Sequence, residues 1–319
     1  MKVKVFGCRG SMARSHAKGS RYGGNTSCMS VESNGQLLII DAGSGLMMFE
    51  DELRAAYPGF PNHLPPTNIL ISHLHIDHIM GLSVFAPLGA AEADVNIYTC
   101  SRDERPLDEQ VFGIFAPPYW PVAMKDVSRA KCVPIQANIP FVVGPFTVTP
   151  FVASHPDKTL SFCITDGHKR FVHLLDNEVD SMNQTAYEEL LNFCHKADMV
   201  VFDSAYSEED YARFMGWGHS TVRQGVELAR ACKAKRMMFC HFGQQYSDDQ
   251  IDSWARFFEK ETCCEFIMGS DGMEVDLQLQ AGCASGRGAD EETCDCICCC
   301  TCRDAISTGG ARHFSHPRG

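Results

Sequence analysis

One short segment constrains this chain more than any other: the run SHLHIDH at residues 72–78. It directly follows the apolar residues 69–71, which predict a buried strand. His73 and His75 are two positions apart, so their side chains project from the same side of an extended segment. Asp77 and His78 come after the expected turn and can face a second ion. An ordinary polar loop would not concentrate three histidines and an aspartate behind a buried strand, so the segment predicts a metal site.

Length, composition and charge limit the class of protein and the partners that the chain can have. The chain has 319 residues, 45% of them hydrophobic and 21% charged, which is ordinary for a globular protein. No apolar run reaches the length of a membrane span, and residues 1–7 resemble a first strand rather than a signal peptide, so we expect a cytoplasmic protein and no membrane partner. The formal net charge of −12 argues against a broad nucleic-acid-binding face, but a small anionic substrate is still acceptable because two bound divalent cations would offset part of that charge.

The order of elements predicts a hydrolase domain over residues 1–280 and a separate tail over 281–319. β-type runs are expected at 3–6, 28–32, 37–41, 68–71, 95–98, 146–151, 171–175, 199–203 and 237–240. Helix-like stretches fall at 45–56, 79–88, 185–196, 221–233 and 248–261. Of the 17 cysteines, seven lie in the tail and ten are scattered before it without paired spacing, which favours reduced thiols. The tail has no hydrophobic periodicity and is expected to be a disordered extension; metal sequestration, lipidation and redox sensing are the alternatives.

Further motifs strengthen the case around the histidine cluster. GCRGS at residues 7–11, YGGNTSC at 22–28 and DAGSG at 41–45 are similar to the opening of one family. Together with residues 72–78 they resemble the metallo-β-lactamase superfamily, specifically the phosphodiesterase branch that includes ribonuclease Z and bacterial cyclic-nucleotide phosphodiesterases. The resemblance covers most of residues 1–280. It implies an α/β fold, the four-layer αββα sandwich of that superfamily.

The resemblance also implies roles for individual residues. One ion would be held by His73, His75 and His155, a second by Asp77, His78 and His241, and Asp176 would bridge the two. The cofactors would then be two divalent ions, zinc first, with manganese or iron as alternatives. Asp77 would also accept the proton of the attacking water. Asp203 would orient His219, which would stabilise phosphoryl charge or protonate the leaving oxygen. Without the resemblance, His155 and His241 are isolated histidines, Asp176 is an Asp in a turn, and His219 adjoins a helix cap.

The sequence therefore predicts a dinuclear metal-dependent hydrolase, with a phosphodiesterase acting on a small cyclic nucleotide or related diester by metal-activated hydroxide as the first reading. The alternatives are a ribonuclease Z-like endonuclease that processes tRNA 3′ ends and a non-hydrolytic diiron redox or sensor protein. We expect a small phosphodiester as the partner, no extensive nucleic-acid binding, and allow a homodimer. The aromatic, proline-rich segment 111–122 is either a lid against which a base stacks or part of the core.

Overall fold

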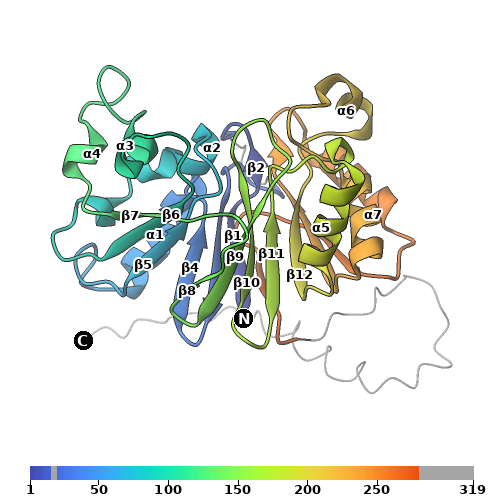
Figure 1. The fold of residues 1–319 in the computed structure, drawn as a ribbon, viewed down its shortest axis with the longest axis horizontal. Helices are drawn as coiled ribbons and strands as arrows, with labels where there is room; N and C mark the ends of the chain where they lie inside the picture. The colour runs from blue at the N-terminus through green and yellow to red at the C-terminus, as the bar shows by residue number, and fades with distance from the viewer. Residues whose placement is uncertain (16–19, 280–319) are drawn as a thin grey trace, which may run out of the picture. The chain divides into compact units, whose positions relative to one another are not determined.

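The computed structural model describes residues 1–15 and 20–279, and two seven-stranded sheets dominate them (Figure 1). The first sheet has the order β16 (Glu274–Asp276), β1 (Lys2–Gly7), β3 (Cys28–Ser33), β4 (Gln36–Ile40), β5 (Thr67–Leu70), β6 (Val95–Thr99) and β7 (Lys131–Pro134). The second has the order β15 (Glu265–Met268), β13 (Arg236–Cys240), β12 (Met199–Asp203), β11 (Arg170–Leu174), β10 (Leu160–Thr165), β9 (Phe146–Val152) and β8 (Phe141–Val143). A two-stranded ribbon pairs β14 (Phe242–Gly243) with β2 (Arg9–Gly10).

Helices connect and cover the strands. The α-helices are α1 (Gly45–Ala56), α2 (Ile76–Ile79), α3 (Leu107–Phe112), α4 (Met124–Val127), α5 (Gln184–Cys194), α6 (Glu208–Phe214), α7 (Val222–Cys232) and α8 (Asp248–Ser253). Short 3₁₀ helices are η1 (Met80–Ser83), η2 (Ala86–Gly89), η3 (Val179–Ser181) and η4 (Trp254–Phe257). Among the described residues, no helix combines the length and apolar character that crossing a membrane requires.

The main core lies between the two sheets. Because neighbouring side chains of a strand point to opposite faces, Leu38 and Ile40 of β4 join this core while Ile39 faces the other way. Phe162 of β10 and Phe202 of β12 reach the same core from the second sheet. The two sheets are thus packed face to face.

Helices bury apolar stripes on the outer faces of the sheets. On α1 the buried Leu46, Phe49 and Leu53 recur at three- and four-residue spacing and pack with Ile39 of the first sheet. Helices α5 and α7 cover the second sheet, and Val226 of α7 is among the buried residues packed there. The expected four-layer αββα arrangement is confirmed.

One expected helix is absent. Residues 79–88 were predicted to form a single helix, but this stretch holds only the end of α2 followed by η1 and η2. Gly81 packs so tightly that a Cβ there would lie 2.4 Å from the Gly43 carbonyl oxygen. Pro87 at the start of η2 also lacks the N–H that a continuous α-helix needs. Tertiary packing beneath the histidine cluster therefore divides the segment into short turns.

Parallel strands set the position of the site. β4 and β5 run parallel in the first sheet, and β11, β12 and β13 run parallel in the second. The carboxyl ends of parallel strands meet at one edge of a sheet. Polar residues that directly follow these strands are therefore gathered at the same edge.

Candidate metal centre

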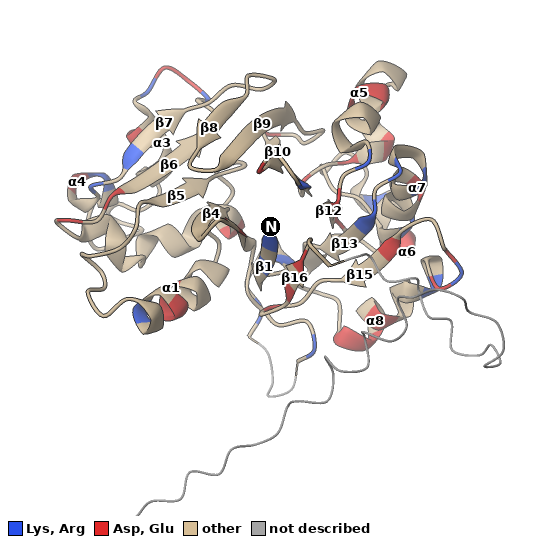
Figure 2. Ribbon diagram, turned by 90° about the horizontal axis from the view of Figure 1, so that it is seen from below, with Lys and Arg blue, Asp and Glu red and all other residues tan. Residues whose placement is uncertain are grey.

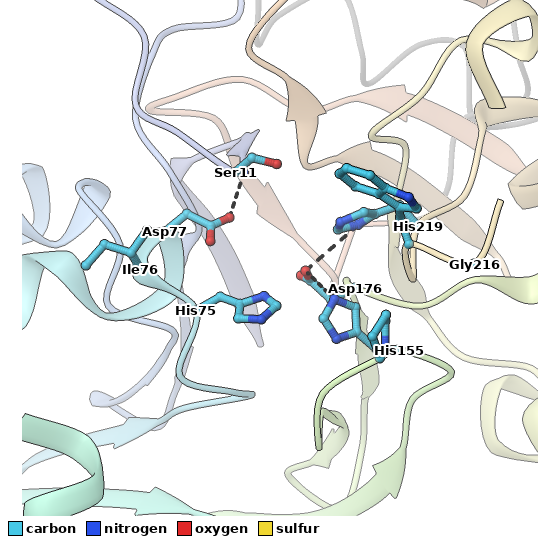
Figure 3. Close-up of a pocket in the computed structure, with 10 residues that line it drawn as sticks. Ser11, His75, Ile76, Asp77, His155, Asp176, Gly216 and His219 are labelled. Carbon is cyan, nitrogen blue, oxygen red and sulfur yellow. Dashed lines mark hydrogen bonds and ion pairs between the residues drawn. The ribbon is translucent and has the colours of Figure 1, made fainter. Parts of the chain in front are cut away.

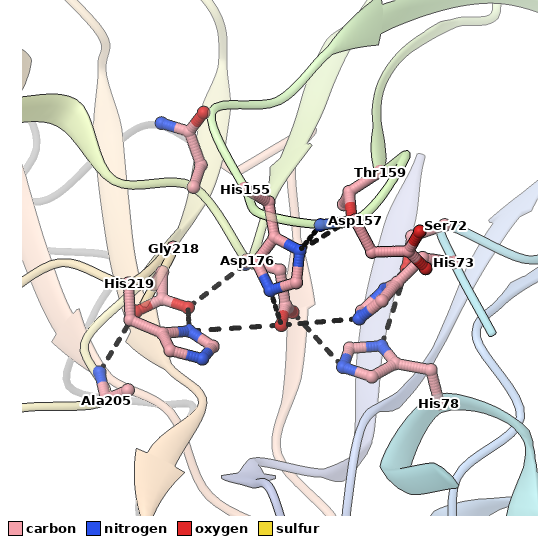
Figure 4. Close-up of polar contacts among 12 residues, drawn as sticks. Ser72, His73, His78, His155, Asp157, Thr159, Asp176, Ala205, Gly218 and His219 are labelled. Atoms are coloured by element: carbon pink, nitrogen blue, oxygen red, sulfur yellow. Dashed lines mark hydrogen bonds and ion pairs between the residues drawn. The ribbon is translucent and has the colours of Figure 1, made fainter. Parts of the chain in front are cut away.

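The predicted ligands sit on the loops that leave these strand ends (Figure 4). His73 follows β5, His75 caps α2, and Asp77 and His78 lie within α2. His155 lies between β9 and β10, Asp176 follows β11, Asp203 ends β12, His219 lies between α6 and α7, and His241 follows β13. The structure gathers these residues into overlapping clusters whose ligand atoms lie within 4.8 Å of one another.

Four atoms form a compact, buried group. Asp77 Oδ2 lies 3.3 Å from both His78 Nε2 and His241 Nε2, and the two Nε2 atoms are 3.3 Å apart. Asp176 Oδ2 lies 3.1 Å from His78 Nε2 and 3.4 Å from His241 Nε2. A tetrahedral zinc ion with bonds of about 2.0–2.1 Å separates its ligand atoms by roughly 3.3–3.4 Å. The donor set therefore fits a tetrahedral divalent cation.

The carboxylates of this buried group also favour the binding of a cation. Burial lowers the pKa of His241, but Asp176 and the neighbouring carboxylates outweigh it and raise this pKa to about 10. Burial raises the pKa of Asp77, but His78 more than reverses this effect and holds that pKa well below its usual range. The carboxylates thus attract protons onto the imidazoles when no cation balances them, and a divalent ion would displace those protons.

A second group is more open. His73 Nε2 and His155 Nε2 each lie 3.7 Å from Asp176 Oδ1, and the ring of His75 is 4.4 Å from that of His73. His73 is fully buried, His155 is half-buried and His75 is exposed. Burial, followed by the charge of His78, holds the pKa of His73 well below its usual value, so this imidazole is neutral as a metal ligand must be.

Asp176 joins the two groups, with Oδ1 directed to the open one and Oδ2 to the buried one. Its backbone has a φ of 51°, in the left-handed region that a residue with a Cβ rarely adopts. Within the described residues, Asp176 Oδ2 and His73 Nε2 are buried with no hydrogen-bond partner. Unpartnered buried polar atoms and a strained backbone are typical of a site whose ligand supplies the missing contacts.

Neighbouring polar groups orient the imidazoles. Asp41 Oδ2 lies 2.8 Å from His78 Nδ1, so the Nδ1 proton can be donated to Asp41 and Nε2 keeps its lone pair. Thr159 Oγ1, 3.1 Å from His155 Nδ1, and Ser72 Oγ, 3.1 Å from His73 Nδ1, can act in the same way. His73, His78 and His155 can thus present Nε2 to the space between the predicted ligands.

Asp203 and His219 form a pair beside these groups. His219 Nδ1 lies 2.9 Å from Asp203 Oδ2, which also accepts a hydrogen bond of 3.0 Å from the Asp176 backbone N–H. Burial lowers the pKa of His219, but the Asp203 carboxylate outweighs it and raises that pKa above its ordinary value. Burial likewise raises the pKa of Asp203, but His219 and His241 lower it overall to about 2. The pairing with Asp203 therefore favours the charged form of the His219 ring.

These side chains line a cavity of about 540 Å³ (Figure 3). It is bounded by Ser11, His75, Ile76, Asp77, His155, Pro156, Asp176, Gly216, Trp217 and His219. The Ser11 backbone N–H donates to Asp77 Oδ2 at 2.7 Å. No residue of segment 111–122 lines this cavity. Val111, Phe112 and Phe115 are buried in the core beneath the first sheet, whereas Tyr119 is 81% exposed, so the core interpretation holds for only part of the segment.

Sequence reasoning missed three residues of this neighbourhood. Asp41 was noted only as part of a glycine-rich turn, although it follows a strand parallel to β5 and could have been placed near His78. Glu178 gave no sequence signal, because its hydrogen bonds join segments about 40 residues apart. Trp217 was given no role, although it lies two residues before His219.

The fold and the site together define a metallohydrolase of the β-lactamase type. A family model described as "Beta-lactamase superfamily domain" matches residues 37–242, more than half of the chain, so the chain belongs to this superfamily. The match includes all seven predicted metal-ligand positions, from His73 to His241.

Curated relatives and solved structures narrow the comparison. A "Ribonuclease Z" of Azobacteroides pseudotrichonymphae is 27% identical over 283 residues, which cover 78% of this chain and 90% of that protein. Human tRNase Z, short form, superposes with a TM-score of 0.60 at 16% identity, covering 88% of this chain and 100% of the other. The metallo-β-lactamase fold protein YhfI of Bacillus subtilis gives a TM-score of 0.62 at 19% identity, covering 86% and 99%. The resemblance to ribonuclease Z-like members is confirmed.

One expectation is wrong. A small-molecule partner without extensive nucleic-acid binding conflicts with relatives whose name describes an enzyme that acts on RNA. The physical error lies in the use of net charge, because a sum over the whole chain does not report the local field at a site. Figure 2 shows Asp and Glu on α1, α6 and α8 and also in loops, so the acidic residues are spread over several elements.

Proposed function

We propose that this protein is a two-metal phosphodiesterase that cleaves RNA, the reaction named in its ribonuclease Z relatives, with precursor tRNA as the first candidate substrate. The observation that carries the proposal is the presence of two adjacent clusters of possible metal ligands and of His219, paired with Asp203, at one cavity. Phosphodiester cleavage needs that combination, because charge must be neutralised on the phosphoryl oxygens while the leaving oxygen gains a proton.

Metal binding is assigned to the residues that geometry groups together. We assign His73, His75 and His155 to one ion, Asp77, His78 and His241 to the other, and Asp176 to both. Nitrogen and oxygen donors suit zinc, with manganese and iron as alternatives. When bound, two such ions would lower the pKa of a water nucleophile and balance the phosphoryl charge.

The chain's own residues complete the chemistry. Asp203 holds His219 by its Nδ1, which directs Nε2 toward the cavity and favours the charged form of the ring. The charged ring binds a phosphoryl oxygen or donates its proton to the departing ribose oxygen. Asp77, kept ionised by His78 and His241 and held by the Ser11 N–H, is assigned the proton of the attacking water.

Metal content tests the ligand assignment. Purified protein should hold about two divalent ions per chain, measured by elemental analysis. His75→Ala should lower both metal content and activity, whereas His195→Ala, at an exposed position after α5, should change neither. Full occupancy in the His75 variant would count decisively against the assignment.

Substrate choice is tested with a 3′-extended precursor tRNA and cyclic nucleotides, each at physiological salt. We expect cleavage of the RNA at one position near the mature 3′ end. Rapid hydrolysis of cyclic nucleotides with intact RNA would contradict the proposal and support the cyclic-nucleotide interpretation instead. A diiron sensor would show neither hydrolysis, and no finding favours it.

A further inference from the structure

A large aromatic side chain is left exposed beside the metal-ligand clusters. Trp217 is 60% exposed and lines the same cavity as His155 and His219. Of the three tryptophans in the chain, Trp254 is buried and Trp120 is half-buried, so packing accounts for both. Packing does not account for Trp217, and an exposed tryptophan beside titratable side chains in a cavity is typical of a ligand contact.

Hydrogen bonds to a buried carboxylate hold the loop that carries Trp217. The Glu178 carboxylate is 1% exposed and accepts hydrogen bonds from the backbone N–H groups of Gly216 at 2.8 Å and Gly218 at 2.9 Å. It also accepts one of 3.0 Å from the Tyr211 hydroxyl. A buried charge is costly unless it is fully hydrogen-bonded, so these bonds hold the loop in one conformation.

Close packing then sets where the loop lies. Gly216 and Gly218 have φ values of 87° and 88°, a conformation that favours glycine. A Cβ at Gly218 would lie only 2.2 Å from His155 Cδ2, so the loop touches a predicted metal ligand. A residue with a Cβ would be strained at either φ, and at Gly218 it would also clash with His155 and so displace the loop that carries Trp217.

Aromatic contacts link the indole to the predicted catalytic histidine. The Trp217 ring meets Phe214 edge-on, with centroids 5.4 Å apart, and Phe214 stacks on Tyr206 at 4.7 Å. Tyr206 in turn meets the His219 ring at 5.6 Å. The indole is therefore supported by a series of rings that ends at His219, two residues further along the chain.

We propose that Trp217 is the stacking surface for the nucleobase next to the scissile phosphate. The inference rests on the proposed function, which brings a phosphodiester to His219. Because Trp217 and His219 line one cavity, a base that stacks on the indole would belong to a nucleotide near that phosphate. Every nucleobase has a π-face, so this contact would add affinity without selecting one base. Because the indole is held in place before binding, little ordering entropy opposes the contact.

A kinetic comparison measures the contact. Base stacking on one aromatic ring is worth about 1–3 kcal/mol, or roughly 5–150-fold in kcat/KM. Trp217→Ala should lose that much on intact RNA but little on RNA with an abasic nucleotide beside the cleavage site, while Trp217→Phe keeps most activity. Met215→Ala, an exposed apolar residue of the same segment that does not line the cavity, is the matched control. An equal loss on both substrates would overturn the proposal.

Fluorescence separates this inference from the proposed function, because it needs no cleavage. Adenosine 5′-monophosphate should quench tryptophan emission of the metal-loaded wild type, and ribose 5-phosphate should not. The quenching should vanish in Trp217→Phe and persist in Trp120→Phe. Quenching without any RNA cleavage would sink the proposed function and leave the stacking surface intact. Quenching that survives in Trp217→Phe, or none in the wild type, would refute the stacking surface.

Discussion

Asp203 connects three parts of the site through one carboxylate. Its Oδ2 lies 2.9 Å from His219 Nδ1, 3.0 Å from the Asp176 backbone nitrogen and 3.2 Å from His241 Nδ1. Its Oδ1 accepts hydrogen bonds from the backbone N–H groups of Ser220 and Ala205. Changing this residue therefore alters the charge of His219 and loosens a predicted metal ligand at the same time, so its effects need a measurement that distinguishes them.

A pH profile provides that measurement. The carboxylate of Asp203 raises the pKa of His219, so the charged ring persists above the ordinary histidine value and is lost as the pH rises through the raised pKa. If the charged ring is needed, turnover falls at that same alkaline pH. Asp203→Asn should move this alkaline limb to lower pH, toward or below the ordinary value, in protein checked for metal content. An unmoved limb would show that His219 does not act in its charged form.

His219 itself is tested by its dependence on the leaving group. His219→Ala should retain both ions, because the residue lies outside the two proposed ligand sets, yet lose roughly 10²–10⁴-fold in turnover on RNA. On a nitrophenyl diester the leaving oxygen needs little help from an acid. The loss should shrink there if His219 protonates the leaving oxygen and persist if it stabilises phosphoryl charge. Normal turnover on both substrates would show that His219 has no catalytic role and merely precedes helix α7.

At the scale of elements, helices α7 and α8 begin with the same capping motif, but only α7 adjoins a predicted catalytic residue. Thr221 at α7 and Ser247 at α8 each form a capping box, the first with Gln224 and the second with Gln250. Helix α7 directly follows His219, whereas α8 lies beyond the metal-ligand segments. The same local change can therefore be compared near the site and away from it.

Removing either cap should cost about 1 kcal/mol of stability. For a domain of this size that corresponds to a fall in Tm of roughly 2–4 °C in Thr221→Ala and Ser247→Ala alike. Turnover should fall only in Thr221→Ala, because fraying of α7 also frees the segment that positions His219. Equal turnover losses in both variants would mean that global stability, and not the position of His219, limits activity.

Sequence patterns foresaw elements with strong local signals and missed those defined by packing. Strands with solid apolar runs were predicted well because both of their faces are buried: β12 has its predicted bounds, and β13 begins one residue earlier than predicted. Strand β10, with the sequence LSFCIT, was missed because the polar Ser161 and Thr165 interrupt the apolar run that would indicate a buried strand. The convergence of the predicted ligands followed from their places after strands, whereas Asp41 and Glu178 act through non-local hydrogen bonds that no local pattern encodes.

At the scale of the whole molecule, the described chain closes on itself at both ends. The last strand, β16, pairs antiparallel with β1, so Val275 faces Val3 across the edge of the first sheet. The Leu277 N–H then donates to the Met1 carbonyl at 2.9 Å, and the Leu277 side chain is fully buried. The folded domain thus includes residues up to Leu277, and the predicted tail, 281–319, lies outside the described residues.

This closure makes the domain boundary testable with two truncations. A chain ending at residue 280 keeps β16 and the buried Leu277, so its Tm and phosphodiesterase activity should match those of the full chain. A chain ending at residue 272 loses an edge strand and uncovers the inner side chain of Val3. Because burying one large aliphatic side chain stabilises a fold by about 1.5–3 kcal/mol, the loss of Leu277 alone should lower Tm by several degrees. Thermal melts of both chains, with metal content measured alongside, check the prediction. A shorter chain as stable as the longer one would show that β16 adds nothing, and a longer chain that fails to fold would place the domain boundary within 281–319.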